Sequence, residues 1–324
     1  MVLSMTCMDR LNAGKTGMKQ PYQHLDVFAD EAFNGNQLAV FLEASGLDVA
    51  RMQRIAGEMA FPETTFVFPA ESAETDARVR IFTPARELPM AGHPTIGTVF
   101  ALVGAGRIAP GAAKVTLGLG IGPTPVFLEW DGPRLTFAWM RQPVPVFGFV
   151  AEHVGKLAAA LGLHERDIRE SGLPAQQVSS GVPVFFIPLA TRAAVNRVTV
   201  DRAALRAFFD DHAQPEQPIF VFSLERGDDD ATAFSRMFAP VFGIPEDPAT
   251  GGASGPLGAY LLQHGAVTPQ KAARMVSLQG VAMGRPSRIT IAISTHNGTI
   301  SEVRVGGTCV SLGTGVLDVP GHCA

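Results

Sequence analysis

Polar and apolar side chains alternate in short segments along the first half of the chain, the pattern of half-buried strands. Residues 23–28 predict a first strand, and a turn at residues 34–36 leads to a second apolar run at residues 38–42. A helix capped by Asp48 is predicted next, because apolar residues follow it at helical spacing. Further strands are predicted at residues 65–68, 78–82, 115–119, 126–130 and 135–139.

Two segments, residues 95–103 and 255–263, carry no charge and are apolar on nearly every side. A helix of this kind must be buried all round. Residues 142–145 are a plausible connection between two halves of the chain. In the second half we expect strands at residues 182–189 and 219–222, helices at residues 153–161, 202–209 and from 268 onward, and β-type alternation from 289 to 319.

One short sequence occurs twice. RIFTP at residues 80–84 is similar to RMFAP at residues 236–240, about half a chain later. In each half a glycine-rich turn follows, and then one of the two uncharged helices. Two generic strand–turn–helix units would also produce this match, but the paired uncharged helices favour a duplicated domain.

The glycine-rich turns lie at residues 91–95 and 246–255. A helix that begins at such a turn has free backbone N–H groups at the positive end of its dipole, where an anion can bind. Two such turns facing each other across an interdomain cleft would hold a small carboxylate, although tight turns into packed helices give the same pattern. The residues predicted to bind the substrate are Gly92, Thr95, Gly251, Gly252, Ala253 and Ser254.

Three ionisable residues stand out by their context. Glu63 lies at the mouth of an apolar strand, where partial burial would raise the pKa of its carboxyl and suit it to acid–base catalysis. His93 lies in the first glycine-rich turn, where an imidazole can exchange a proton with a ligand, and Asp247 precedes a proline in the second turn. Each also has an ordinary structural interpretation: an exposed strand-end carboxylate, a hydrogen-bonded turn histidine and an Asx turn.

Composition narrows the range of partners. The 324 residues include 26 Lys and Arg against 30 Asp and Glu, and the resulting net charge of −4 gives no general attraction to nucleic acid or an anionic membrane. No segment has the run of apolar residues that a membrane-spanning helix needs, and no secretory signal is apparent. Three distant cysteines predict no disulfide framework, so we expect a cytoplasmic protein. The histidines show no metal-ligand spacing, so no metal is expected.

Several motifs together are similar to one family. Residues 26–28, 35–36, 58–66, 80–84, 87–95, 246–251 and 278–287 closely resemble the phenazine-biosynthesis isomerase (PhzF-like) family, in order, within a similarity that runs from about residue 23 to 319. The resemblance implies an α+β, diaminopimelate-epimerase-like fold of two pseudo-symmetric domains. Each domain is a β-barrel-like sheet around a central helix, with the active site in the cleft between them. We expect domains at residues 21–140 and 145–320, the last strand completing the first domain, and an extension without fixed structure at residues 1–20.

The resemblance also implies an activity, a cofactor-independent isomerase that moves a proton between carbons of a small carboxylate. The family's characterised member acts on trans-2,3-dihydro-3-hydroxyanthranilate. Glu63 matches the family's acid/base, while His93 and Asp247 match residues that contact polar groups of the substrate. A homodimer without cofactor, nucleic acid or membrane partner is therefore expected.

Two departures from the family pattern bear on the substrate. Gly252 stands where the family usually has a serine, and residues 60–62 are Ala-Phe-Pro in place of Asn-Leu-Ser. A hydroxyl donor is lost at the first position, and the surroundings of Glu63 become less polar at the second.

Two other functions stay open from the sequence. Amino-acid racemases of the same fold use two facing cysteines at the helix tips, but here the tips carry His93 and the Gly252 region. A non-catalytic binding protein would keep the cleft without turnover. The joint presence of Glu63, His93 and Asp247 argues against that reading.

Overall fold

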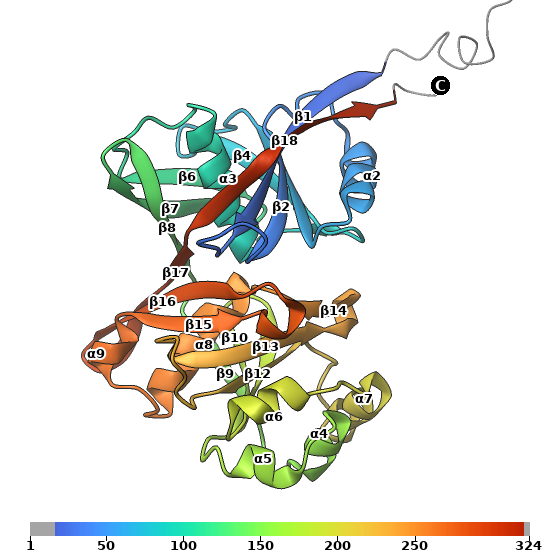
Figure 1. Cartoon of the computed structure of the whole chain (residues 1–324), viewed down its shortest axis with the longest axis vertical. Helices are drawn as coiled ribbons and strands as arrows, with labels where there is room; N and C mark the ends of the chain where they lie inside the picture. The colour runs from blue at the N-terminus through green and yellow to red at the C-terminus, as the bar shows by residue number, and fades with distance from the viewer. Residues whose placement is uncertain (1–16, 321–324) are drawn as a thin grey trace, which may run out of the picture.

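The computed structural model describes residues 17–320, which form two β-rich halves that lie one above the other in Figure 1. Each half wraps a twisted sheet around one helix, α3 (Gly92–Gly104) in the first half and α8 (Gly251–Gln263) in the second. These are the two uncharged segments, and most of their residues are buried. Both helices begin earlier than predicted, at Gly92 and Gly251, because each glycine-rich turn is itself the first helical turn.

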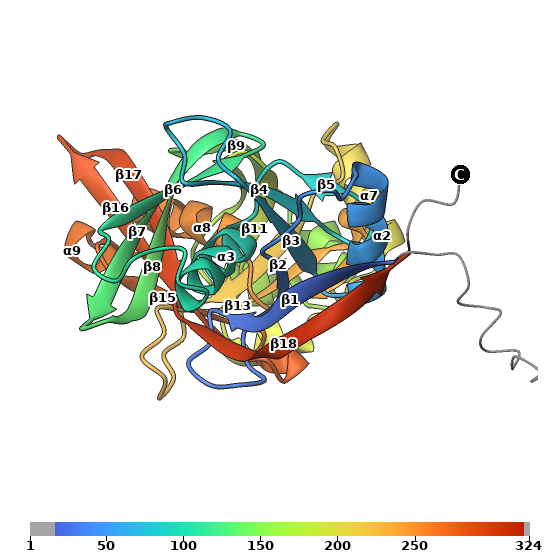
Figure 2. The same ribbon diagram turned by 90° about the horizontal axis from the view of Figure 1, so that it is seen from above.

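In the first half the strands pair in the order β18, β1, β2, β3, β4, β6, β7 and β8, with β5 beside β4 and with α2 packed outside. Figure 2 shows β1 and the C-terminal strand β18 side by side. The elements are β1 (Met18–Val27), β2 (Asn36–Phe41), α2 (Val49–Met59), β3 (Glu63–Phe68), β4 (Ala77–Phe82), β5 (Glu87–Leu88), β6 (Lys114–Leu119), β7 (Gly122–Asp131), β8 (Arg134–Gln142) and β18 (Cys309–Val319).

The second half repeats this order as β9, β10, β11, β12, β13, β15, β16 and β17, with β14 beside β13. Strand β17 pairs with β8 and so joins the two halves. The elements are β9 (Val146–Ala151), α4 (Gly155–Ala160), α5 (Glu165–Arg169), β10 (Ala175–Ser179), β11 (Pro183–Pro188), α6 (Arg192–Arg197), α7 (Arg202–Asp211), β12 (Ile219–Ser223), β13 (Ala233–Ala239), η1 (Pro240–Phe242), β14 (Ile244–Asp247), α9 (Pro269–Ala272), β15 (Met275–Gln279), η2 (Val281–Met283), β16 (Ser287–His296) and β17 (Thr299–Gly307).

The pairing supports the predicted duplication. In the first half β2 is parallel to β3 and β4 to β6, and in the second half β11 is parallel to β12 and β13 to β15. The repeated sequence lies on the equivalent strands β4 and β13. The predicted α+β, diaminopimelate-epimerase-like fold is thereby matched in architecture, and solved relatives described below confirm it.

The same ion pair occurs in both halves. Arg80 donates from Nε and Nη2 to both carboxylate oxygens of Glu87, at 2.7 and 2.6 Å. Arg236 makes the same two bonds to Glu246, each 2.8 Å long. Each guanidinium also lies over the phenylalanine two residues further along its strand.

The predicted extension at the N-terminus needs correction at its end. Residues 1–16 lie outside the described part, but β1 begins at Met18 and not at Gln23. Met18 pairs with Val319 and Gln20 with Leu317, so β18 supplies a partner that the local sequence does not reveal. Strand β10 and helices α5 and α6 were also not predicted, since these short segments lack a clear period of their own.

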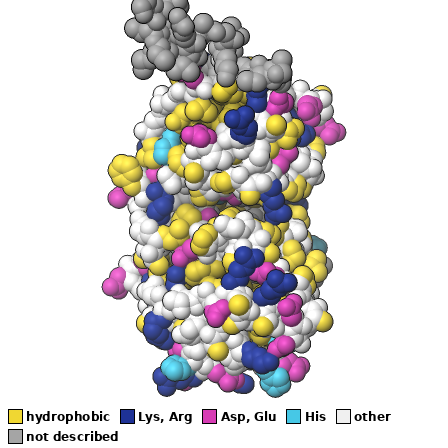
Figure 3. Space-filling model, turned by 90° about the vertical axis from the view of Figure 1, so that its right-hand side faces the viewer, with side chains coloured by type: hydrophobic (Ala, Val, Ile, Leu, Met, Phe, Trp, Pro, Cys, Tyr) yellow, Lys and Arg dark blue, Asp and Glu magenta, His cyan; other side chains and the backbone are white. Residues whose placement is uncertain are grey.

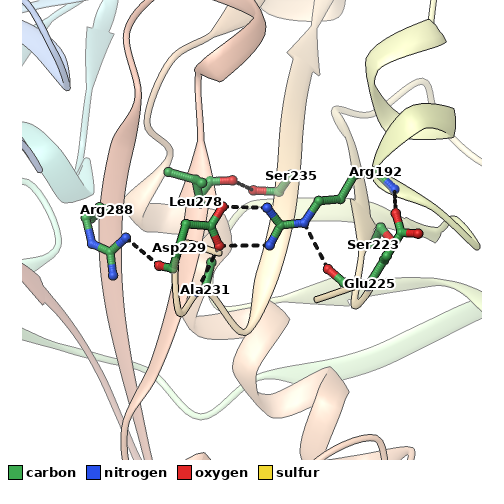
Figure 4. A network of polar contacts seen from close by, with 8 residues as sticks. All are labelled: Arg192, Ser223, Glu225, Asp229, Ala231, Ser235, Leu278 and Arg288. Atoms are coloured by element: carbon green, nitrogen blue, oxygen red, sulfur yellow. Dashed lines mark hydrogen bonds and ion pairs between the residues drawn. The ribbon is translucent and has the colours of Figure 1, made fainter. Parts of the chain in front are cut away.

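A polar network holds the start of α6, one of the outer helices of the second half (Figure 4). Arg192 of α6 donates from both terminal nitrogens to Asp229 and from Nε to the carbonyl of Glu225. These bonds lower the pKa of Asp229 to about 2 against the opposing effect of burial. Arg288 of β16 donates to the carbonyl of Asp229, and its own amide donates to the carbonyl of Phe28 in the first half. The network thus reaches from α6 toward the junction of the halves.

Within residues 17–320, no helix is long and apolar enough to cross a membrane.

The duplicated ion pairs allow a matched stability test. The Arg236 side chain is 10% exposed, and its Nη1 also donates to the carbonyls of Val195 and Val198 at the end of α6. The Arg80 side chain is 23% exposed and has no such contacts. We expect Arg236→Met to lower the free energy of unfolding by about 3–5 kcal/mol, and Arg80→Met by only about 0–1 kcal/mol. Urea titration of both variants measures this, and equal losses would contradict the difference in burial.

Candidate active site

The N-termini of α3 and α8 meet at the junction of the halves. A side chain on Gly92 would place its Cβ 2.9 Å from the Cα and carbonyl carbon of Gly251. Only glycine permits this approach of backbone to backbone. A Cβ on Gly251 would in turn lie 3.0 Å from the ring of Phe28.

Neither helix has a side-chain cap. Ala91 and Thr250 occupy the N-cap positions, and the side chain of neither accepts a hydrogen bond from the first-turn amides. The hydroxyls of Thr95 and Ser254 turn the other way and donate to the carbonyls of Ala91 (2.6 Å) and Thr250 (2.9 Å). The two helix tips therefore direct backbone N–H groups toward the same region, as an anion site requires.

The carboxyl of Glu63 and the imidazole of His93 face each other in the interior. Figure 3 shows one face of the molecule, on which a crease runs between the two halves. Glu63 Oε2 lies 3.3 Å from His93 Nε2, and the two residues are 9% and 4% exposed. Neither atom has a hydrogen-bond partner of favourable geometry among residues 17–320. These two facing atoms are thus buried without a hydrogen-bond partner among the described residues.

Burial sets the protonation of this pair. It lowers the pKa of His93 to about 3, although a hydrogen bond to the backbone of Gln37 acts in the opposite direction. Burial also raises the pKa of Glu63 well above its ordinary value, and the charge of Asp247 adds to this. At neutral pH the imidazole of His93 is therefore uncharged, and the pKa of Glu63 is shifted toward the protonated form.

Asp247 approaches from the second half, at the end of β14. Its Oδ1 accepts from Asn36 Nδ2 at 2.7 Å, and its Oδ2 accepts from the Thr250 hydroxyl at 2.5 Å. Burial raises the pKa of Asp247 to about 6, while hydrogen bonds from Thr250, Asn36 and the amide of Ala249 pull it down. Burial thus raises the pKa of both carboxyls, and hydrogen-bond donors oppose that rise only at Asp247.

Environments that push two neighbouring carboxyl groups to different pKa values are typical of acid–base sites. Here the two carboxyls come from different halves, and each requires the fold to meet the other. His93 and Gly252 occupy the same position in their respective helices, the second residue of α3 and of α8.

The structure therefore brings Glu63, His93 and Asp247 together. Gly92, Gly251 and Gly252 lie at the helix tips beside them. The amides of Ala253 and Ser254 already donate to the carbonyl of Thr250 at 3.2 and 3.1 Å. Gly251 and Gly252 consequently have the freer amides of the second tip.

The sequence analysis assigned no role to Asn36, Thr250 or Gln279, each of which makes a hydrogen bond to Asp247. Asn36 lies in a stretch that predicts only a turn, and Gln279 ends a strand. The motifs that resemble the family include both residues, so those motifs were the one available signal.

Comparison with known proteins decides the family. The family model described as "Phenazine biosynthesis-like protein" matches residues 25–315. The chain belongs to the PhzF family. Trans-2,3-dihydro-3-hydroxyanthranilate isomerase of Pseudomonas aeruginosa is 35% identical over 297 residues, which cover 91% of this chain and 98% of the relative. An uncharacterised isomerase of Escherichia coli K12, YddE, is 32% identical over 307 residues, which cover 91% of this chain and 97% of the relative.

Solved structures agree. A phenazine biosynthesis protein of the PhzF family from Bacillus anthracis matches with a TM-score of 0.83 and 28% identity over 93% of this chain and all of the other. A hydroxyproline epimerase from Agrobacterium vitis shares the fold at a TM-score of 0.61 with 12% identity. The predictions of the PhzF family, its fold and an isomerase are confirmed.

The contact between the helix tips can be tested with two alanine variants. In Gly92→Ala the new methyl group meets the backbone of Gly251, so we expect a loss of about 1–3 kcal/mol and a lower Tm. A Cβ on Gly252 meets nothing within 4 Å, so Gly252→Ala should stay within about 0.5 kcal/mol of wild type. Thermal unfolding of the two proteins side by side gives the result. A Gly92→Ala protein as stable as wild type would mean that the tips do not touch.

Proposed function

We propose that this PhzF-family isomerase moves a proton between two carbons of a small cyclic carboxylate similar to trans-2,3-dihydro-3-hydroxyanthranilate, with Glu63 as the acid/base. The observation that carries the proposal is the buried Glu63–His93 pair, 3.3 Å apart, next to the second buried carboxyl of Asp247. The name of the P. aeruginosa relative supports the substrate class.

A single group that both takes and returns a proton needs both protonation states near the working pH. The raised pKa of Glu63 supports this role, since it makes the carboxylate a stronger base and shifts the balance toward the acid form. The proton leaves one substrate carbon for a Glu63 oxygen and is then delivered to another carbon. The electron pair released at the first carbon shifts through the conjugated system of the substrate to the second.

The other groups bind and orient. Neutral His93 accepts a hydrogen bond at Nε2 or passes a proton along, and ionised Asp247 accepts from a polar hydrogen of the ligand. The helix tips at Gly92 and Gly251–Gly252 bind the carboxylate of the ligand through backbone N–H groups. A two-thiol racemase gains no support, because Cys309, the cysteine within residues 17–320, lies on β18 and not in the first turn of α3 or α8.

The acid/base role is tested by Glu63→Gln, which keeps the shape of the side chain and removes its basicity. We expect kcat on trans-2,3-dihydro-3-hydroxyanthranilate to fall at least about 10²–10⁴-fold while ligand binding is retained. Glu58→Gln, an exposed position on α2, is the matched control and should behave as wild type. Turnover by Glu63→Gln near the wild-type rate would reject the assignment.

The position of the missing family serine gives a second test. Gly252 does not have a left-handed φ, and the direction of its Cβ is open, so a serine fits there. One added hydrogen bond of about 0.5–1.5 kcal/mol should raise kcat/KM on the same substrate roughly three- to tenfold in Gly252→Ser. Gly252→Ala adds the Cβ without the hydroxyl and should show no gain. If wild type is already efficient and the serine variant gains nothing, glycine has not shifted the preference.

A further inference from the structure

The Asp247 carboxylate is held by donors from both halves of the molecule. Asn36, the first residue of β2, is fully buried, and its Nδ2 donates to Asp247 Oδ1 at 2.7 Å and to the carbonyl of Ala249 at 3.0 Å. Thr250 donates to Oδ2 from its own half. Each carboxylate oxygen thus has one side-chain donor.

The direction of the Thr250 hydroxyl is fixed by Gln279 at the end of β15. Gln279 Nε2 donates to Thr250 Oγ1 at 3.0 Å and to the carbonyl of Asp247 at 2.7 Å, and its Oε1 accepts from the Thr250 amide at 3.1 Å. Because the Thr250 oxygen accepts from Gln279, its own hydrogen is directed to Asp247. Gln279 is completely buried, so these bonds have no competition from solvent.

Asn36 is held just as firmly. The turn before it is bound from the second half by Arg285, which donates to the carbonyls of Gly35 (2.8 Å) and Asn34 (2.7 Å) and to Asp26 (2.5 Å). The orientation of the Asn36 amide is also determined, since both of its Nδ2 partners are acceptors and the opposite orientation would set oxygen against oxygen.

We propose that Asn36 is a positioning residue that acts through Asp247: its amide holds the Asp247 carboxylate in place, in the charged form, across the junction of the halves. Glu63 is then the carboxyl that carries the transferable proton. This inference rests on the proposed function. It gives a physical reason why Glu63 transfers the proton while Asp247 binds the ligand.

The charged and titratable groups around Asp247 are few. Glu63 of β3 interacts with it electrostatically, with neutral His93 of α3 beside Glu63, and Glu246 precedes it on β14. Glu246 is paired with Arg236 of β13. No cation among these groups contacts Asp247 itself, so neutral donors hold its charge. Removal of one donor should therefore make Asp247 harder to ionise, and Glu63 should ionise more readily once its neighbour is neutral.

The test is the pH dependence of kcat/KM for Asn36→Leu, which has a similar volume and no donor. The acidic limb reports the ionisation of the interacting carboxyls Glu63 and Asp247 together, and we expect it to move upward by about one to two pH units. Activity should recover at pH values above the shifted limb. Thr250→Val should move the limb in the same direction, whereas Thr250→Ser, which keeps the hydroxyl, should leave it in place. Activity that falls by the same factor at every pH, with an unmoved limb, would overturn the proposal.

A second measurement does not depend on turnover. The ¹³C carboxyl signal of Asp247 can be titrated by NMR in the ligand-free full-length wild type, in Thr250→Val and in Thr250→Ser. A higher titration midpoint in the valine variant alone supports the inference even if wild type proves inactive on the chosen substrate, in which case only the proposed function fails. Identical midpoints in all three proteins would refute the inference. This test remains available if Asn36→Leu does not fold.

Discussion

The site depends on one steric constraint, the backbone contact between the tips of α3 and α8. Gly92 and Gly251 approach so closely that a single methyl group on Gly92 would collide with the opposite backbone. This contact places two uncapped helix N-termini at one point and brings the start of β3 toward the end of β14. Buried in this junction, the carboxyls of Glu63 and Asp247 and the imidazole of His93 all acquire displaced pKa values. Electrostatics follows from packing here, because water is excluded from groups that would otherwise titrate normally.

The two halves share one strand order, but they carry different residues at the equivalent positions that form the site. The equivalent arginines Arg80 and Arg236 pair across the sheet with Phe66 and Val221. Three residues before these partners stand Glu63 in one half and Pro218 in the other. The residue after the paired glutamate is Leu88 in the first half and Asp247 in the second. Each half thus carries a carboxyl where its counterpart is apolar, so neither half alone contains both carboxyls, Glu63 and Asp247.

The three ionisable candidates were visible in the sequence, since Glu63 opens an apolar strand and His93 and Asp247 lie in the glycine-rich turns. Their supporting residues were not. The sequence around Asn36 predicts only a turn, and its partner Asp247 lies more than two hundred residues away. Gln279 bonds to the loop that follows β14. Contacts of this range leave no trace in periodicity, because periodicity reports only which face of one element is buried.

The sequence by itself determined the family, the duplicated strand–turn–helix units and the two helices that had to be buried, because charge-free segments and glycine-rich turns are local properties of the chain. Tertiary structure alone decided where β1 starts, since Met18 is held by pairing with Val319 at the other end of the chain. It also decided how the two carboxyls titrate. Local sequence gives Glu63 and Asp247 similar intrinsic acidity, and only the fold supplies burial near the charge of Asp247 for one and three hydrogen-bond donors for the other.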